Sequence, residues 1–219
     1  KYLLSEDGVF IVQFMYAGAM IENHNFDTIY HEHLCYYTLR SLMNLLKPYG
    51  LEVFDAYHSD IHSGSIIAKV THSSSKLNKK TERFDSVLSQ DEKYTLEEFL
   101  SFAKAVEDKK NDLRDLLLHL KNEGKRVYAY GAPAKGNTLL NYFGITKDLV
   151  SKAVEINELK IGNYLPQSHI PITKESKLDL PDYYLLLSHN FAEEIIAKNQ
   201  DIMEKGVKFI IPFPKVEIV

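Results

Sequence analysis

Hydrophobic and polar positions follow two kinds of pattern along this chain, and together they predict a mixed α/β protein. The nearly continuous apolar run Val9–Phe14 is typical of a strand covered on both faces. Residues 38–47 instead place leucines three and four positions apart, which is typical of an amphipathic helix. Two further strands are predicted over 51–57 and 65–70.

The second half of the chain alternates between strand and helix patterns. A long amphipathic helix is predicted over residues 94–122, ending at Gly124. Beyond it, alternation predicts a parallel sheet flanked by helices. The expected strands are 126–130, 149–156, 183–187 and 208–211, and the expected helices are 137–143 and 192–204. Between the two halves, residues 71–92 are polar and rich in Ser and Lys, so we expect a linker.

Composition narrows the classes of protein to consider. The chain has 219 residues, 45% of them apolar and 26% charged, which is ordinary for a soluble globular protein. The net charge of −4 disfavours a nucleic-acid binder, and no apolar run is long enough for a membrane span. A single cysteine, Cys35, excludes an internal disulfide framework and a multi-cysteine zinc site, and fits the cytoplasm. Because the chain lacks an initial Met and opens like the last turn of a helix, we expect that an upstream part is missing.

A glycine-containing turn is expected between the strand 126–130 and the helix that follows it. Gly131 and Gly136 would let a phosphate approach the free backbone N–H groups and the positive end of the helix dipole. Glu155, near the end of the next strand, lies where dinucleotide-binding folds keep an acid for ribose hydroxyls. The alternative is that both glycines only allow tight packing of helix on strand.

The cluster Tyr30-His31-Glu32-His33 concentrates titratable groups among apolar and aromatic neighbours. One interpretation is an acid/base site, since a free imidazole titrates near 6.5 and a positioned base contributes roughly 10² to 10⁴ in rate. Glu32 would orient the base, and Tyr30 would stabilise an oxyanion. A metal site using His31 and His33 and a purely structural cluster remain the alternatives.

Two smaller candidates lie in turns. His62 and Ser65 flank a turn before a strand, where they would meet a ligand, although turns favour Ser and Gly for conformational reasons. His189 and Asn190 follow the strand 183–187, and ligands of open α/β sheets bind at the carboxyl ends of strands. Asn190 would serve equally well as a helix N-cap.

Three blocks together resemble the S-adenosylmethionine-dependent sugar C-methyltransferases, which add a methyl branch to keto intermediates of nucleotide-linked deoxysugars. The blocks are FDTIYHEH at 26–33, YGAPAKGNTLLNY at 130–142 and HIPI at 169–172. The resemblance implies an α/β fold, with the end of a class I methyltransferase Rossmann-like domain followed by a second Rossmann-like parallel-sheet domain. The implied parts are a methyltransferase portion at 1–72, a linker at 73–93 and a sugar-nucleotide-binding domain at 94–219.

The resemblance also implies roles for individual residues. His33 matches the likeliest catalytic base, with Tyr30 and Glu32 beside it in the active site. The nucleoside-diphosphate sugar would be bound by residues from several turns and helices, namely His62, Ser65, Gly131, Lys135, Gly136, Asn137, Glu155 and Asn190. S-adenosylmethionine would be held mainly by the missing upstream methyltransferase half, and zinc would occur only in a missing N-terminal module.

Three positions depart from the family pattern. The chain has His62-Ser63-Gly64-Ser65 where the family often has His-Gly-Gly-Ser, Ile67 where an Arg is frequent, and His189 where a Trp is common. These departures leave the identity of the sugar and its phosphate contacts open. The leading hypothesis is C-methyl transfer through a base-generated enolate; the alternatives are a non-catalytic nucleotide-binding module and a metal-dependent enzyme using His31 and His33.

Overall fold

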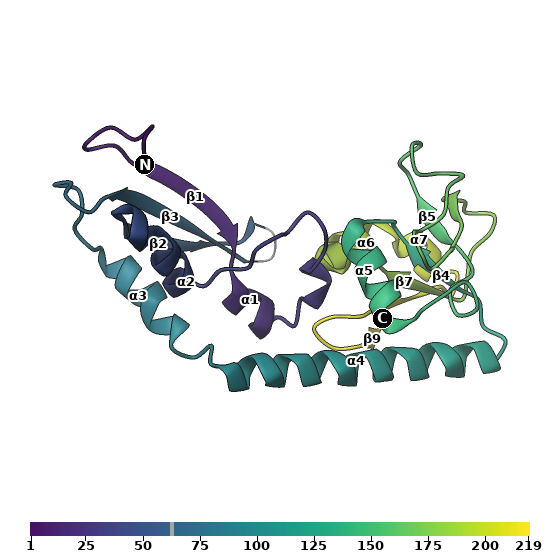
Figure 1. The fold of residues 1–219 in the computed structure, drawn as a ribbon. Coiled ribbons are helices and arrows are strands. Elements are labelled where there is room, and N and C mark those ends of the chain that lie inside the picture. Colours follow the sequence, from purple (N-terminus) through teal and green to yellow (C-terminus); the bar gives the residue numbers. More distant parts are fainter. Residues whose placement is uncertain (62–63) are drawn as a thin grey trace. The chain divides into compact units, whose positions relative to one another are not determined.

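A computed structural model describes residues 1–61 and 64–219, and it divides into two compact units (Figure 1). Unit 1 consists of residues 1–23 and 33–102, and unit 2 of residues 24–32 and 103–219. Among the described residues, unit 1 contains a three-stranded sheet and unit 2 a six-stranded sheet. The short segment 24–32 thus belongs to the same unit as the distant C-terminal half of the chain.

Unit 1 is built on an antiparallel sheet with the strand order β1-β3-β2. Its strands are β1 (Phe10–Met15), β2 (Leu51–Ser59) and β3 (Ser65–His72). Its helices include α1 (Ala17–Glu22), α2 (Leu39–Leu46), the 3-10 turn η2 (Lys47–Tyr49) and α3 (Glu82–Asp91). The predicted strand, helix and strand pair are confirmed, with ends that differ by one or two residues.

The core of unit 1 follows from the period of its apolar residues. Every second residue of the central strand β3, namely Ile66, Ala68 and Val70, is fully buried, as expected for a strand that packs one face on helices. Thr38 is the N-cap of helix α2 and forms a capping box with Ser41. Leu39, Leu42 and Leu46 lie at helical spacing and are buried in the core of unit 1.

Strand β1 lies at the edge of this sheet, and its exposure differs from the expectation of two covered faces. Phe10 is 44% and Ile11 60% exposed. An edge strand has one row of backbone groups without a neighbouring strand, and here β1 pairs only with β3 among the described residues. Apolar content alone does not tell which faces of a strand are covered.

The segment 73–93, expected to be a linker, contains helix α3. Phe84 and Val87 on this helix are each 2% exposed and belong to the core of unit 1. Three or four apolar residues among many Ser, Lys and Asp side chains are enough to bury one face of a short helix. The predicted domain limits stay a prediction.

Unit 2 contains a mostly parallel sheet with the strand order β6-β5-β4-β7-β8-β9. The strands are β4 (Val127–Tyr130), β5 (Ala153–Glu155), β6 (Ile172–Lys174), β7 (Tyr183–Leu186), β8 (Lys208–Ile211) and the antiparallel β9 (Glu217–Ile218). The remaining elements are η1 (Phe26–Thr28), α5 (Ala134–Phe143), η4 (His189–Phe191), α6 (Ala192–Lys198) and α7 (Gln200–Met203). This sheet confirms the predicted α/β class and its Rossmann-like character.

The order of the strands determines where a ligand site is expected in unit 2. From β4 the chain moves through β5 to β6 on one side, and it then returns to add β7 and β8 on the other side of β4. In open parallel sheets, ligands bind beyond the carboxyl ends of strands where the order reverses. A ligand site is therefore expected at the turns that follow β4 and β7.

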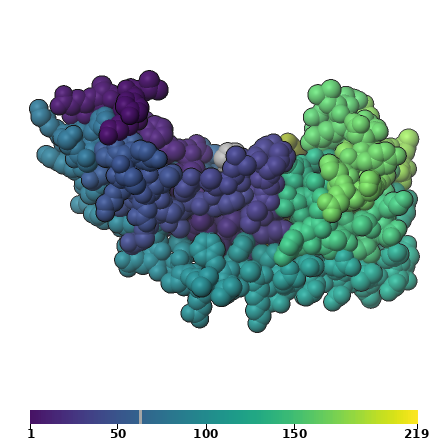
Figure 2. Space-filling model, in the orientation of Figure 1, coloured from purple at the N-terminus to yellow at the C-terminus, as the bar shows by residue number. Residues whose placement is uncertain are grey.

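Helix α4 (Leu96–Asn122) confirms the long predicted helix and contributes residues to both units. Val106, Leu113, Leu117 and Leu120 are buried at helical spacing. Much of the helix lies at the surface, seen as the teal atoms along the lower edge of Figure 2. Among residues 1–61 and 64–219, no helix combines the length and the apolar character that a bilayer span requires.

Asp55 of β2 provides a test of the packing of unit 1. Its buried carboxylate accepts hydrogen bonds from Arg83 and from Thr81 Oγ1 at 2.8 Å, and Lys69 Nζ lies 3.2 Å away. Hydrogen bonding to Arg83, above all, holds the pKa of Asp55 well below its usual range. Since the folded pKa is depressed, the stabilisation is complete above the unfolded pKa of about 4 and is lost as the pH falls below it.

We therefore expect Asp55→Asn to lower the free energy of unfolding by about 3 kcal/mol at pH 7, the lower end of the range for breaking a buried ion pair. The difference from wild type should shrink steadily as the pH is lowered from about 5 towards 2. Urea denaturation at several pH values measures both effects. Glu52→Gln, which removes a half-exposed partner of Lys80, is the control and should cost under about 1 kcal/mol. A pH-independent difference for Asp55→Asn would contradict the ion-pair explanation.

Candidate functional site

The segment 24–32 is attached to unit 2 by an aromatic cluster. Phe26 of η1 is 5% exposed, and its ring stacks on Phe143 at the end of α5, with centroids 5.1 Å apart and planes 18° apart. It also meets Phe213 edge-on at 5.6 Å and lies 5.2 Å from Tyr142. Such ring pairs add roughly 0.5–1.5 kcal/mol each to the burial of apolar area.

A buried ion pair lies next to this cluster. His189 Nε2 is 2.8 Å from Asp27 Oδ2, and the two side chains are 8% and 1% exposed. A carboxylate is rarely buried without a partner, because losing its hydration costs several kcal/mol. The pair therefore attaches the segment preceding Tyr30 to the carboxyl end of β7.

The turn after β4 is shaped by Gly131 and Glu155. Gly131 has a φ of +83°, a left-handed conformation that glycine adopts without strain. The N–H of Ala132 donates to Glu155 Oε2 at 3.1 Å, and the carboxylate also accepts from the N–H groups of Ile156 and Asn157. The turn is thus held to the end of β5 by a side-chain carboxylate.

These bonds also determine the charge state of Glu155. Burial by itself raises the pKa of this carboxyl, but three backbone N–H donors outweigh burial and lower the pKa below its ordinary value. Lys160 Nζ, 3.7 Å away, acts in the same direction. Because both oxygens are engaged by the protein itself, the ribose-binding role predicted for Glu155 gains no support from its contacts, and it stays a prediction.

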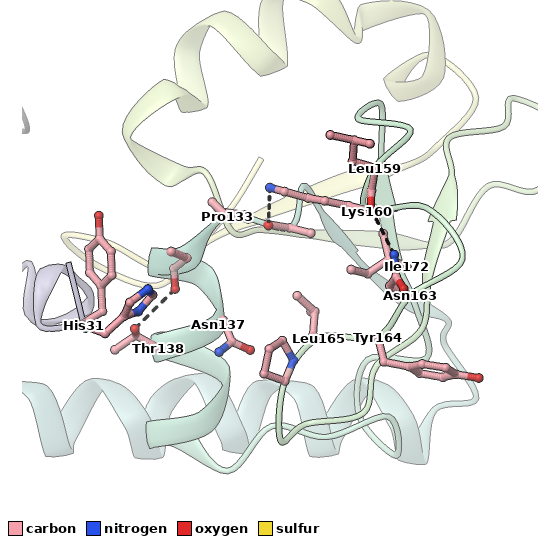
Figure 3. Close-up of a pocket in the computed structure, with 14 residues that line it drawn as sticks. His31, Pro133, Asn137, Thr138, Leu159, Lys160, Asn163, Tyr164, Leu165 and Ile172 are labelled. Atoms are coloured by element: carbon pink, nitrogen blue, oxygen red, sulfur yellow. Dashed lines mark hydrogen bonds between the residues drawn. The ribbon is translucent and has the colours of Figure 1, made fainter.

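A pocket of about 330 Å³ opens in unit 2 beside this turn (Figure 3). His31 and Thr138 lie on one side of it, and Leu159 and Lys160 on the opposite side (Figure 3). Its walls come from segment 24–32, the β4–α5 turn with the first turns of α5, and the connection between β5 and β6. The lining residues are Tyr30, His31, Ala132, Pro133, Ala134, Asn137, Thr138, Leu159, Lys160, Asn163, Tyr164, Leu165, Pro166 and Ile172.

Several hydrogen-bond donors lie at this pocket. Helix α5 begins after Pro133, which provides no side-chain cap, so its first backbone N–H groups carry the positive end of the helix dipole. Lys160 Nζ donates to the carbonyl of Ala132 at 2.9 Å and has further N–H donors to offer. Asn137 Oδ1 is a buried oxygen that lacks a hydrogen-bond partner within the described part of the chain. The arrangement favours an anionic ligand with some hydrogen-bond donors of its own.

The predicted catalytic residues are divided between the units. In unit 2, Tyr30 OH donates to Glu32 Oε2 at 3.3 Å, and His31 Nε2 is 4.0 Å from Glu32 Oε1. His31 and Glu32 have side chains that are 83% and 64% exposed. His33 belongs to unit 1 and is partly buried. The roles assigned to these residues stay predictions.

The structure places the predicted substrate-binding residues in several different settings. Asn137 lines the pocket described above, and Gly131 and Glu155 line an adjacent pocket of about 300 Å³ that shares Lys160 and Pro133 with it. Asn190 is exposed in η4. Ser65 is in β3 of unit 1, where its hydroxyl donates to the Ile61 carbonyl at 2.7 Å. His62 lies outside the described residues.

Gly136 and Lys135 lie in the first turn of α5 and not in a loop, because the helix begins at Ala134, three residues earlier than expected. A Cβ atom on Gly136 would lie 2.5 Å from Leu187 Cβ, so this glycine allows the helix to approach the end of β7 closely. The contact supports the packing interpretation of Gly136, which the sequence analysis had kept as an alternative.

Several residues of this region were missed from the sequence. Lys160, Asn163 and Tyr164 lie in the connection between β5 and β6. Strand β6 was itself not predicted, because it has only three residues. Asp27 carried a signal, since it stands three residues before Tyr30 in the same block, but its partner His189 is 162 positions away. Sequence spacing gives no indication of such a pair.

A metal site would require several ligating side chains close together. Among the described residues, no group of three or more His, Cys, Asp or Glu side chains is arranged to hold a metal ion. The alternative of a metal-dependent enzyme using His31 and His33 therefore gains no support from the described geometry.

The packing role of Gly136 can be tested by adding a single methyl group. Gly136→Ala improves helix propensity by about 1 kcal/mol, yet the clash with Leu187 should lower the free energy of unfolding by a net 1–3 kcal/mol, roughly. Thermal and urea unfolding measure the change. Lys135→Ala, one residue earlier in the same helical turn, is the control and should stay within about 0.5 kcal/mol of wild type. An unchanged stability of Gly136→Ala would show that close packing is not the reason for glycine here.

Comparison with known proteins gives a family for the chain. Residues 60–214 match a family described as the C-methyltransferase C-terminal domain. The chain is also 34% identical over 222 residues to C-methyltransferase NovU of Streptomyces niveus, and the match covers 99% of this chain and 53% of NovU. The chain thus spans about half the length of this curated relative. The resemblance seen in the three sequence blocks is confirmed at this level, and the chain belongs to the C-methyltransferase family.

Proposed function

We propose that this chain is the C-terminal portion of an enzyme that transfers a methyl group to the carbon next to the ketone of a nucleotide-linked deoxysugar. Membership of the C-methyltransferase family supports the type of reaction. The observation that carries the proposal is the shared pocket: Tyr30 and His31 of the predicted catalytic block line the same cavity as the start of α5 and Lys160.

The proposed substrate is a nucleoside-diphosphate sugar, because the pocket suits a diphosphate. Two features favour negative charge, namely the N-terminal end of α5 and the ammonium group of Lys160. The orphaned oxygen of Asn137 accepts hydrogen bonds, as sugar hydroxyls require. The aromatic and apolar rim at Leu159 and Tyr164, which are 87% and 63% exposed, offers surface for a nucleobase or a deoxysugar ring.

The proposed chemistry begins with removal of a proton. A carbon beside a ketone becomes nucleophilic when it loses its proton, and His33 is the proposed base that takes it. As the C–H bond breaks, its electron pair moves toward the ketone oxygen, and the Tyr30 hydroxyl donates a hydrogen bond to the developing oxyanion. Glu32 is proposed to orient the base. Tyr30 OH has a single hydrogen, which it donates to Glu32 Oε2 at 3.3 Å here, so the hydroxyl leaves Glu32 when it donates to the oxyanion.

The proposed methyl donor is S-adenosylmethionine, which supplies an electrophilic methyl group on a sulfonium. The pocket of unit 2 does not fit this cation, because its charged and dipolar groups favour an anion. Glu155 is engaged by backbone N–H groups and Lys160, so it is not available for a cofactor ribose in this arrangement. We therefore assign no residue of this chain to the donor.

We further propose that a methyltransferase half upstream of this chain binds the donor, and that any zinc belongs to a separate N-terminal module. The edge strand β1, with Phe10 and Ile11 exposed, is a suitable place for such a partner to extend the sheet. The proposed location is the cytoplasm, for which the single cysteine, Cys35, is the supporting feature.

A non-catalytic nucleotide-binding module is the second candidate function. The donor-rich pocket at the start of α5 favours it as much as it favours an enzyme, since both would hold a diphosphate. The two candidates differ in what they require of His33 and Tyr30, which only an enzyme needs.

Binding is tested by calorimetric titration of this chain with thymidine-diphosphate sugars, other nucleoside-diphosphate sugars and S-adenosylmethionine. We expect binding of the nucleotides and no binding of S-adenosylmethionine. Lys160→Met should weaken nucleotide binding about tenfold or more, because a charge-assisted hydrogen bond contributes roughly 1.5–3 kcal/mol. Lys147→Met, which removes an exposed lysine outside the pocket, is the matched control. Equal affinities for the two variants would contradict the assignment of the diphosphate to this pocket.

Catalysis is tested by steady-state kinetics of the full-length enzyme with single substitutions. His33→Ala should lower kcat by about 10² to 10⁴ because the base is lost. Tyr30→Phe should lower it by about 10² or more because one oxyanion donor is lost. His119→Ala, on the exposed face of α4, is the control. Retention of full turnover in His33→Ala, with nucleotide binding intact, would favour the binding module.

A further inference from the structure

We infer that Asp27 and His189 are positioning residues, which hold the segment bearing Tyr30 and His31 at the wall of the pocket. The inference rests on the proposed function for its catalytic consequence, because Tyr30 has a chemical role only in an enzyme. Its structural part, that this one pair controls the order of segment 24–32, stands on the contacts within unit 2.

The geometry of the pair indicates which side chain donates the hydrogen bond and which accepts it. Asp27 Oδ2 and His189 Nε2 are 2.8 Å apart, and with the carboxylate oxygen as the acceptor His189 carries the hydrogen on Nε2 and donates it. The other oxygen, Asp27 Oδ1, is buried and lacks a partner within the described part of the chain. The histidine is therefore the main compensation for burying this carboxylate, and its removal leaves the charge strongly disfavoured where it is.

The pair also belongs to the aromatic cluster that buries the segment. The ring of His189 lies 4.9 Å from the ring of Phe213, and Phe213 in turn meets Phe26 at 5.6 Å. Asp27 follows Phe26 directly in η1, so the bond to His189 and the aromatic contacts are made by adjacent residues. Loss of the ion pair would disturb ring packing at the same place.

Short-range hydrogen bonds connect the backbone around Asp27 to Tyr30. The hydroxyl of Thr28 donates to the Asn25 carbonyl at 2.7 Å, and the N–H of Tyr30 donates to the Thr28 carbonyl at 3.1 Å. Three residues span at most about 10 Å, so the path from the ion pair to the pocket wall is short. A misplacement of about 1 Å at a reacting group is enough to lower a rate by about 10².

His189 is also fixed to the part of the sheet on which the pocket is built. It begins η4 directly after β7, and β7 pairs in parallel with β4, whose following turn lines the pocket. The pair thus fixes the catalytic block with respect to neighbouring strand ends, which are rigid elements. A surface ion pair such as His119–Glu123, with side chains 67% and 49% exposed, has no comparable connection.

The structural part is tested by hydrogen exchange of this chain. His189→Phe keeps a ring but removes the donor, whereas His189→Gln keeps an N–H at a similar reach. We expect His189→Phe to increase exchange of the backbone amides of residues 26–30 by about tenfold or more, with global unfolding little changed, and His189→Gln to stay near wild type. His119→Phe is the matched control and should alter neither. Wild-type exchange at 26–30 in a folded His189→Phe would overturn the inference.

The catalytic part is tested in the full-length enzyme at a temperature where every variant is folded. His189→Phe should lower kcat about 10- to 100-fold while KM for the nucleotide sugar changes less than about threefold. His189→Gln should recover most of the loss, and the double variant Asp27→Asn, His189→Phe should be no slower than His189→Phe, since the two residues act as one unit. Additive losses, or an equal loss in His189→Gln and His189→Phe, would overturn a positioning role.

These outcomes separate the inference from the proposed function. If the wild-type enzyme transfers no methyl group, the proposed function fails, and the exchange experiment still decides whether the pair orders residues 24–32. If His189→Phe does not fold, Asp27→Leu provides the same test, because it removes the acceptor of the hydrogen bond from His189, whereas Asp27→Asn would keep an acceptor oxygen. Wild-type exchange at residues 26–30 and wild-type turnover in a folded Asp27→Leu would then overturn the inference.

Discussion

The pairing of Asp27 with His189 is the constraint on which the candidate site depends. Residues 24–32 belong to unit 2, although the next residue of that unit, Ala103, is more than seventy positions further along the chain. The Asp27 side chain, 1% exposed, has the imidazole of His189 as its hydrogen-bond partner, and the neighbouring Phe26 inserts into a cluster of rings. The pocket wall formed by Tyr30 and His31 follows from these two attachments.

Most of the fold could be predicted from the sequence because its elements are determined by local patterns. The leucines of α2, the long apolar face of α4 and the β-rich runs of β4, β7 and β8 each contain enough periodic residues to be identified. The elements that were not predicted are short or contain few apolar residues. Strands β6 and β9 have three and two residues, and α3 buries few residues among many polar ones, so tertiary packing and not local pattern determines them.

The candidate site was only partly predictable, for a different reason. Tyr30 and Asn137, which belong to recognisable blocks, were predicted and line the pocket, whereas the place of Lys160 and the pairing of His189 with Asp27 depend on contacts between distant segments. Gly136, which was predicted either to let a phosphate approach or to allow tight packing, lies against Leu187 inside α5, because the helix starts three residues earlier than its pattern indicates. Side-chain partners across the sheet are a property of the assembled fold.

The contacts of Glu155 distinguish the two pockets that lie beside the turn after β4. In many Rossmann-like folds an acid at this strand end binds a ribose, but here three backbone N–H groups and Lys160 already surround the carboxylate. The acid therefore stabilises the turn, and Lys160, whose Nζ lies 3.7 Å from Glu155 Oε2 and donates to the Ala132 carbonyl at 2.9 Å, also lines the neighbouring pocket. On the side of His31 and α5, one pocket combines the N-terminal end of the helix, the ammonium group of Lys160 and the Asn137 oxygen that lacks a partner within the described residues, a combination that suits an anionic ligand.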